Sequence, residues 1–251
     1  MKVLVVFGSK SDDAVSAPLA QSLSADFDVE REVISAHRDL GKLQDKLAGW
    51  RGDAVVAGAG LAAALPGVVA AMVKIPVFGV PVNSQFGGID SFASIAQMPP
   101  GVPVMTCGPD KPEAVVSFLK SYKKSPGGIF ARINFVAPDA ALLAHPDLLA
   151  EIEKAKAAAK ENGIDAVLSA AESAEAFNIY IVTGPDHVTG GFGLHLPFFP
   201  KAEAQKPENY FSAYAWARRG GLWVGVNNAR NAAAAVARLK GAAQFSKEKA
   251  A

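Results

Sequence analysis

Two short clusters of polar residues combine the side chains needed to bind an anion and to move a proton. Residues 8–12 (GSKSD) follow the apolar run 3–7, and residues 35–38 (SAHR) follow another short β-branched stretch. Small residues and hydroxyls let backbone N–H groups approach a phosphate, while an arginine beside a histidine joins an anion-binding group to a proton carrier. The alternative is that the Ser and Asp residues only cap helices and that His37 is a polar loop residue. Because both clusters directly follow a predicted strand, we favour a ligand-binding site over helix capping.

The elements around these clusters alternate between strand and helix. The spacing predicts strands at 3–7, 28–34, 54–57, 76–82 and 102–106, with helices at 13–25, 40–50, 61–72, 90–97 and 112–122. Such alternation with short connections predicts a parallel sheet covered by helices on both faces, here a five-stranded flavodoxin-like sheet. Ligands bind at the carboxyl edge of sheets of this kind, so we expect both clusters to meet there.

Composition excludes several classes of protein. The chain has 251 residues, 50% of them hydrophobic and 20% charged, with a formal net charge of +1 and no long cluster of Lys and Arg, so no nucleic-acid partner is expected. A single cysteine, Cys107, excludes an intrachain disulfide and a cysteine-based metal site. The apolar start is too short for a signal peptide, and we expect a cytoplasmic protein.

One uncharged stretch, residues 54–73, is long enough to be mistaken for a membrane span. It is mostly Ala, Gly and Val, and Gly58, Gly60, Pro66 and Gly67 interrupt it. A buried strand, a tight turn and a small-residue helix explain its apolarity without lipid. We therefore expect no membrane partner.

Several motifs in register carry a resemblance to a known family. They are GSKSD at 8–12, SAHR at 35–38, AGAG at 57–60 continuing to LPG at 65–67, GVPV at 79–82, and DS, SI, QMP and GVPV between 90 and 104. Over residues 2–122 the chain resembles the aminoimidazole ribonucleotide (AIR) carboxylase family, which includes the N5-carboxyaminoimidazole ribonucleotide (N5-CAIR) mutases of purine biosynthesis. The resemblance implies a flavodoxin-like fold, an octamer of such domains, a ribonucleotide substrate, and neither metal nor organic cofactor.

The resemblance also implies roles for individual residues. His37 matches the catalytic histidine, a general acid/base in the movement of a carboxyl group from the exocyclic nitrogen, or from free CO2, to ring carbon C4. Asp12 suits a ribose hydroxyl better than a phosphate, because like charges repel, and a guanidinium suits a phosphate. The product is 4-carboxy-5-aminoimidazole ribonucleotide. The substrate-binding residues implied are Ser9, Ser11, Asp12, Ser35, Arg38, Gly58, Ala59 and Gly60.

The chain departs from the family pattern at two places. Ala64 stands where the family has a histidine, and residues 84–86 (SQF) replace the usual Ser-Lys or Ser-Arg. These departures leave open whether the enzyme is an N5-CAIR mutase or a CO2-using AIR carboxylase. Two other functions stay open: a noncatalytic nucleotide-binding or regulatory protein, and a carboxylase of another heteroaromatic nucleotide on the same fold.

A second α/β segment follows the charged, Pro/Gly-containing linker 123–128. Strands are expected at 131–137, 166–169, 179–183, 194–199 and 222–226, and helices at 146–161 and 229–239. Residues 33–38 align with 167–172, and 101–104 with 221–224, which predicts a tandem repeat. We thus expect two flavodoxin-like three-layer α/β domains with parallel sheets: a catalytic domain at 1–124 and a diverged, noncatalytic repeat at 128–251. The alternative is two unrelated α/β domains.

The second domain lacks the polar clusters of the first. Ala171 and Glu172 stand where the histidine and arginine would be, and residues 137–139 (APD) replace the phosphate loop. His187 and His195 lie eight residues apart in a Gly-rich region, which is a weak metal signal. We expect that region to contact a neighbouring domain, at the edge of the site of a first domain. Two domains per chain predict a homotetramer, a pseudo-octamer of domains, with four sites built from residues 1–125.

Overall fold

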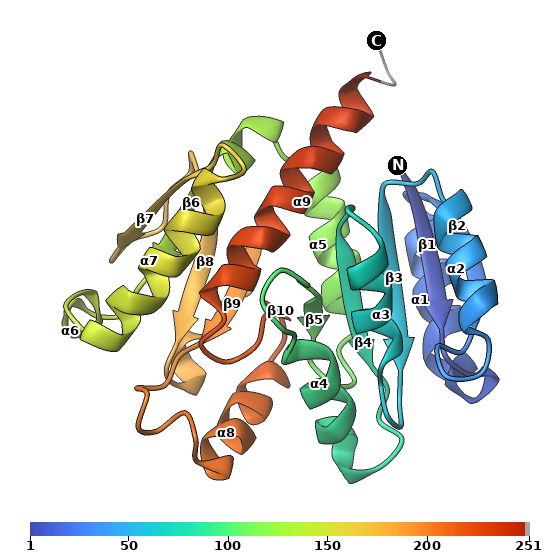
Figure 1. Ribbon diagram of the computed structural model, residues 1–251, viewed down its shortest axis with the longest axis horizontal. Helices are drawn as coiled ribbons and strands as arrows, with labels where there is room; N and C mark the ends of the chain where they lie inside the picture. Colours follow the sequence, from blue (N-terminus) through green and yellow to red (C-terminus); the bar gives the residue numbers. More distant parts are fainter. Residues whose placement is uncertain (249–251) are drawn as a thin grey trace.

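The first half of the chain alternates strands and helices as predicted. The computed structural model describes residues 1–248 and confirms an α/β fold with a mostly parallel sheet (Figure 1). The strands of this half are β1 (Lys2–Phe7), β2 (Asp28–Val33), β3 (Ala54–Ala59), β4 (Val77–Pro81) and β5 (Met105–Cys107). Its helices are α1 (Asp13–Ser24), α2 (Leu40–Gly49), α3 (Leu65–Met72), α4 (Ile89–Ala96) and α5 (Glu113–Lys124).

The second half has a similar series of strands with fewer long helices between them. Its strands are β6 (Arg132–Val136), β7 (Asp165–Ser169), β8 (Phe177–Val182), β9 (Gly193–Pro197) and β10 (Leu222–Trp223). Its helices are α6 (Ala140–Leu143), α7 (Pro146–Lys160), α8 (Pro207–Ala217) and α9 (Ala229–Glu248). No long helix lies between β7 and β8 or between β8 and β9, where the first half has α2 and α3.

All ten strands form one sheet rather than two separate ones. Its order is β2-β1-β3-β4-β5-β10-β9-β8-β6-β7. Counted from its own outer edge, the second half has the order β7-β6-β8-β9-β10, which corresponds to β2-β1-β3-β4-β5 in the first half. Pairs within each half are parallel, and the halves meet through the antiparallel pair of β5 and β10. The outer strand β2 (DVEREV) carries charges that protect an exposed edge from further pairing.

The sheet register corrects our alignment of the two halves. β4 and β9 each have five residues and end at a proline, and Phe78 on β4 pairs with Met105 while Leu194 on β9 pairs with Leu222. Leu222 therefore corresponds to Met105, three residues from the position that the sequence alignment gave it. The same offset relates Asp110 to Asn227, and both residues have left-handed backbone, with φ of 60° and 52°.

Alternate residues of β1 enter two apolar cores, which shows that helices cover both faces of the sheet. Val3, Val5 and Phe7 pack in the core that contains α1 and α5 side chains. Leu4 and Val6 pack in the core that contains α2 and α3 side chains. Successive side chains of a strand point to opposite faces of the sheet, which explains why the two sets enter different cores. All five side chains are fully buried, because helices cover both faces.

The stretch 54–73 is the predicted strand, turn and helix. β3 is completely buried, and α3 begins four residues later than expected because Ala62 has left-handed backbone, with φ of 48°. Across residues 1–248, we find no helix with the length and apolarity that a bilayer crossing requires. The strand expected at 102–106 begins only at Met105, since Pro103 has no N–H to donate to a neighbouring strand.

Candidate functional site

The predicted site residues converge on one cavity of about 220 Å³ at the carboxyl ends of β1, β2 and β3. Three loops surround it: one follows β1, one follows β2, and one joins β3 to α3. The parallel strands put these loops side by side, as the sequence predicted. The predicted residues that line the cavity are Ser9, Ser11, Asp12, Ser35, His37, Arg38, Ala59 and Gly60.

Gly58 is the one predicted residue that does not line this cavity. It lies inside β3, where its carbonyl accepts a hydrogen bond from Gly8 N at 3.0 Å. A Cβ at this position would collide with the ring of Phe7. The glycine therefore lets β1 and β3 approach closely and so sets the position of the loop after β1.

The loop after β1 gathers hydroxyl groups around a buried carboxylate. Ser9 Oγ accepts a hydrogen bond from Ser11 N at 3.2 Å and lies 2.8 Å from Ser11 Oγ. Ser11 Oγ is also 3.2 Å from Asp12 Oδ1. Burial raises the pKa of Asp12, and the hydrogen bonds from Ser11 and from the Ser9 backbone partly offset that effect. The hydroxyls can bind phosphate oxygens, and the carboxylate can accept from a ligand hydroxyl.

The turn after β2 presents His37 and Arg38 to solvent. Ser35 holds the turn, because its Oγ accepts from Arg38 N at 3.3 Å and its carbonyl accepts from Asp39 N at 2.9 Å. Arg38 Nη2 lies 3.4 Å from the carbonyl oxygen of Gly8, across the cavity entrance. His37 makes no hydrogen bond to any residue in 1–248, so its imidazole is available to a ligand.

The loop after β3 forms the opposite wall of the cavity. A Cβ on Gly60 would collide with Ser84 Oγ, so a larger residue here would force the Ser84 side chain, on the loop that follows β4, to move. Ala64 and Leu65, at the start of α3, also line the cavity. Ala64, where the sequence resemblance predicts a histidine, therefore brings only a methyl group to the edge of this site.

Several lining residues were not predicted as ligand contacts. Ser84 and Ala64 are the informative ones, because the sequence marks both positions only as departures from the family pattern. The others are small or apolar and lie beside predicted residues, so no chemical signal distinguished them. They are Gly8, Ala36, Leu61, Ala62 and Leu65.

At the turn after β7, which matches the turn after β2, the polar side chains of Asn134 and Ser169 line a cavity but are also bound to the backbone. The carbonyl of Ala171 accepts hydrogen bonds from Asn134 Nδ2 at 2.9 Å and from Ser169 Oγ at 2.7 Å. Asn134 also donates to Asn178 Oδ1 at 2.9 Å. Asp139 caps α6 by accepting from Leu142 N at 2.9 Å. Asn134, Ser169 and Asp139 thus use these polar groups in contacts within the protein.

His195 is a core residue of β9 and not a metal ligand. It is fully buried, stacked on Trp223 with ring centroids 4.6 Å apart. Thr189 N donates to its Nε2 at 3.1 Å, so Nδ1 carries the proton and donates to the Leu222 carbonyl at 3.1 Å. Residues 1–248 contain no group of three or more His, Cys, Asp or Glu side chains that could hold a metal ion.

The Gly-rich region near these histidines contacts the first half, but away from its site. Residues 190–193 line a separate cavity with α5, and Phe192 packs on Phe118 with ring centroids 4.7 Å apart. The candidate site is lined only by residues between Gly8 and Ser84. Our expectation that this region borders the site is therefore wrong within one chain.

Comparison with known proteins gives a family match over the half that holds the cavity. The AIR carboxylase family matches residues 2–119. The N5-carboxyaminoimidazole ribonucleotide mutase of Pyrococcus abyssi is 50% identical over 115 residues, which are 43% of this chain and 66% of that protein. The mutase of Methanocaldococcus jannaschii is 42% identical over 113 residues, 44% of this chain and 71% of that protein.

In a third relative the match covers a much smaller share of the protein. The bifunctional purine synthesis protein purC/E of Dictyostelium discoideum is 46% identical over 107 residues, 41% of this chain and 11% of that protein. Each of these matches spans less than half of the present chain, and in the Pyrococcus protein it spans just under two thirds of the relative. The resemblance to the family is confirmed for the first half.

Proposed function

The chain belongs to the AIR carboxylase family, and we propose that its first half catalyses carboxyl transfer in purine biosynthesis. The product is 4-carboxy-5-aminoimidazole ribonucleotide, formed from N5-CAIR or from AIR and CO2. The observation that carries this proposal is the convergence of Ser9, Asp12, His37 and Arg38 on one cavity inside the segment that the family matches.

In this proposal the substrate phosphate lies between the loops after β1 and β2. Arg38 donates to the phosphate, and the Ser9 and Ser11 hydroxyls also bind phosphate oxygens. Asp12 accepts a hydrogen bond from a ribose hydroxyl. The cavity is open at His37 and Arg38, so a charged ligand reaches them without crossing apolar core.

His37 acts on the ring carbon. In the mutase route the N–C bond breaks to release CO2, and the exocyclic nitrogen takes up a proton; in the carboxylase route CO2 arrives free. The CO2 carbon then forms a bond to C4, and the proton on C4 is removed. Imidazole changes protonation near neutral pH and suits that step. The backbone of Ala59 and Gly60, which line the cavity, keeps the carboxyl carbon close to C4, and such proximity is worth on the order of 7–11 kcal/mol.

Carboxyl donor and catalytic competence are tested together in one assay. The purified full chain is incubated with N5-CAIR, and separately with AIR and bicarbonate, and product is followed by its absorbance. Turnover of N5-CAIR identifies a mutase, and turnover that requires bicarbonate identifies a carboxylase. Tight ligand binding without turnover of either substrate would contradict the proposal.

A noncatalytic nucleotide-binding protein is the second candidate, and the observation that favours it is Ala64. That residue lines the cavity at the position of a family histidine and brings no polar group to it. The same assay separates the two functions, provided that AIR binding is measured by calorimetry on the same preparation.

We also propose that residues 128–251 form a diverged, noncatalytic repeat of residues 1–124. The equal strand order of the two halves supports a duplication. The loss of catalysis is supported by the turn after β7, where the sheet register gives Ala174 and Glu175 the positions of His37 and Arg38. The cytoplasmic location expected from the sequence stays a prediction.

A further inference from the structure

The helix α3 forms one wall of the candidate site but has little support of its own. It has eight residues (LPGVVAAM) and no side chain that caps its first turn. Helices of this length are unstable in isolation and depend on tertiary contacts. Because Ala64 and Leu65 at its beginning line the cavity, any shift of α3 changes the shape of the site.

The last helix of the chain reaches α3 from the second half. Arg238, on α9, donates from Nη2 to the carbonyl oxygen of Ala70 at 2.9 Å. Ala70 lies in the last turn of α3, where carbonyls lack helical partners and a positive charge is favourable. Burial lowers the pKa of Arg238 to about 10, and the guanidinium is still protonated at neutral pH. In Figure 1, α9 crosses the middle of the molecule beside α7.

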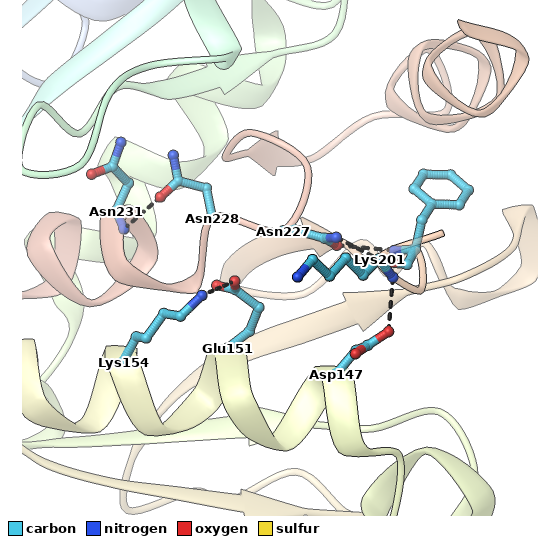
Figure 2. A network of polar contacts seen from close by, with 8 residues as sticks. Asp147, Glu151, Lys154, Lys201, Asn227, Asn228 and Asn231 are labelled. Carbon is cyan, nitrogen blue, oxygen red and sulfur yellow. Dashed lines mark hydrogen bonds and ion pairs between the residues drawn. The ribbon is translucent and has the colours of Figure 1, made fainter. Parts of the chain in front are cut away.

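The beginning of α9 makes a second connection to α3 through the turn at 98–102. Asn231 is 2% exposed; its Oδ1 accepts from Gly101 N at 2.8 Å, and its Nδ2 lies 3.0 Å from the carbonyl of Pro99. Asn228, which caps Asn231 N in Figure 2, donates to the carbonyl of Met98 at 2.8 Å.

Met98 in turn lies against α3. A Cβ on Gly67 would come within 2.7 Å of its terminal methyl carbon, so the glycine provides the space into which the methionine packs. Arg238 and Asn231 therefore reach the same short helix, one at its last turn and the other through Met98.

The corresponding face of α5 does not make these contacts. With the offset set by the sheet register, Asn231 corresponds to Ala114 and Arg238 to Ser121. Both of these small residues line a cavity of about 220 Å³ between α5 and the second half. Thus α9 carries long polar side chains where it reaches α3 and the turn at 98–102. At the corresponding positions, α5 carries small side chains that face the second half.

We infer that Arg238 and Asn231 are positioning residues, through which the second half holds α3 and the wall of the first half's site in place. The inference rests on the proposed function for its catalytic consequence, but not for its structural one. It gives the second half a task in catalysis although none of its residues up to 248 lines the cavity.

The test compares Arg238→Met with Lys240→Met in the full chain. Lys240 is a matched control on the same helix, because its Nζ donates to the carbonyls of Asn162 at 3.2 Å and Gly163 at 2.7 Å, within the second half. Amide hydrogen exchange is measured for peptides that cover residues 61–73 and 155–164. We expect Arg238→Met to speed exchange in the first peptide about tenfold, and Lys240→Met to affect only the second.

Two further variants separate positioning from general loss of stability. Arg238→Lys keeps one charged donor and should restore most of the protection in residues 61–73. Asn231→Ala should speed exchange in 98–102 and in 61–73 together. Equal acceleration throughout the chain in Arg238→Met, or unchanged exchange in 61–73, would overturn the inference.

Activity is then read on the same proteins. We expect kcat/KM to fall about tenfold in Arg238→Met, to recover in Arg238→Lys and to be unaffected in Lys240→Met. If the wild-type chain has no carboxyl-transfer activity, the proposed function fails while the exchange data still decide the positioning role. Altered exchange with unchanged kcat/KM would confine α9 to a structural role and contradict the catalytic part of the inference.

Discussion

Two adjacent residues of the site differ in how firmly they are held. Arg38 contacts the loop after β1 through the Gly8 carbonyl, and Ser35 fixes its backbone. His37 has neither kind of side-chain contact to residues 1–248. A general base must also be positioned, and a catalytic side chain without partners in the free protein takes its orientation from the bound substrate.

Replacing His37 tests the proton-transfer role. We expect His37→Asn to fold and to bind the nucleotide as the wild type does, because its side chain contributes no contact to the core. Turnover should fall by roughly 100-fold or more, the usual effect of losing acid–base catalysis. Steady-state kinetics and calorimetric binding of AIR check both parts, and undiminished turnover would remove His37 from the mechanism.

Replacing Arg38 tests the phosphate contact. Arg38→Ala should weaken substrate binding by about 1.5–3 kcal/mol, the typical contribution of a charged hydrogen bond. The nucleoside that lacks the phosphate serves as the control ligand, and it should bind the wild type and the variant equally. If that nucleoside still distinguishes the two proteins, the arginine acts on another part of the substrate.

At the scale of elements, β9 carries a buried histidine that links stability to pH. Protonation of His195 would place an N–H at Nε2 against the N–H of Thr189, and burial lowers the pKa of His195 to about 4. The unfolded chain binds that proton with a pKa near 6.5. Stability from this residue is therefore complete above pH 6.5 and is lost as the pH falls toward 4.

Urea unfolding at pH 7 and pH 5 measures this linkage. His195 should account for about 2 kcal/mol of the decrease in the free energy of unfolding between these two pH values. His195→Gln cannot titrate, so its decrease should be smaller by that amount, although its stability at pH 7 is also lower because the stack on Trp223 is lost. Equal decreases in the two proteins would show that His195 is not the group responsible.

Most elements of the first half could be predicted because strand ends and small-residue loops have clear local signals. Apolar runs followed by GSKSD or SAHR locate the carboxyl ends of β1 and β2, and parallel pairing then brings both loops together. The start of α3 could not be placed, because the left-handed conformation of Ala62 has no signature in an Ala-rich stretch. The alignment of the halves was displaced by three residues, since only the register of β4 with β5 and of β9 with β10 fixes it.

For the whole molecule, the continuous sheet could not be predicted from local patterns. β5 has three residues and β10 two, too few for any periodicity, and their pairing joins positions more than a hundred residues apart. Both strands are fully buried at the centre of the sheet. The pairing covers an edge that each half would otherwise expose.

Assembly is the prediction at this scale. We expect four chains to form a homotetramer with four sites, in which eight similar halves surround a common axis. Phe86 and Phe211 are large apolar side chains that are 77% and 58% exposed on the single chain. Exposed apolar side chains of this kind are typical of protein–protein interfaces. Light scattering measures the mass, and calorimetry with AIR counts the sites. A monomer, or one nucleotide bound in each half of a chain, would contradict this arrangement.

The pairing of β5 with β10 also has a genetic consequence. In an assembly of identical copies, a codon change alters every equivalent position at once, so a substitution that helps one contact must be tolerated at all the others. Here the two sides of the junction are encoded separately within one gene and are synthesised in a one-to-one ratio. Each side can accumulate its own substitutions, as Asn231 at the position that corresponds to Ala114 illustrates. Neither side can be lost from the assembly by dissociation or by unequal expression.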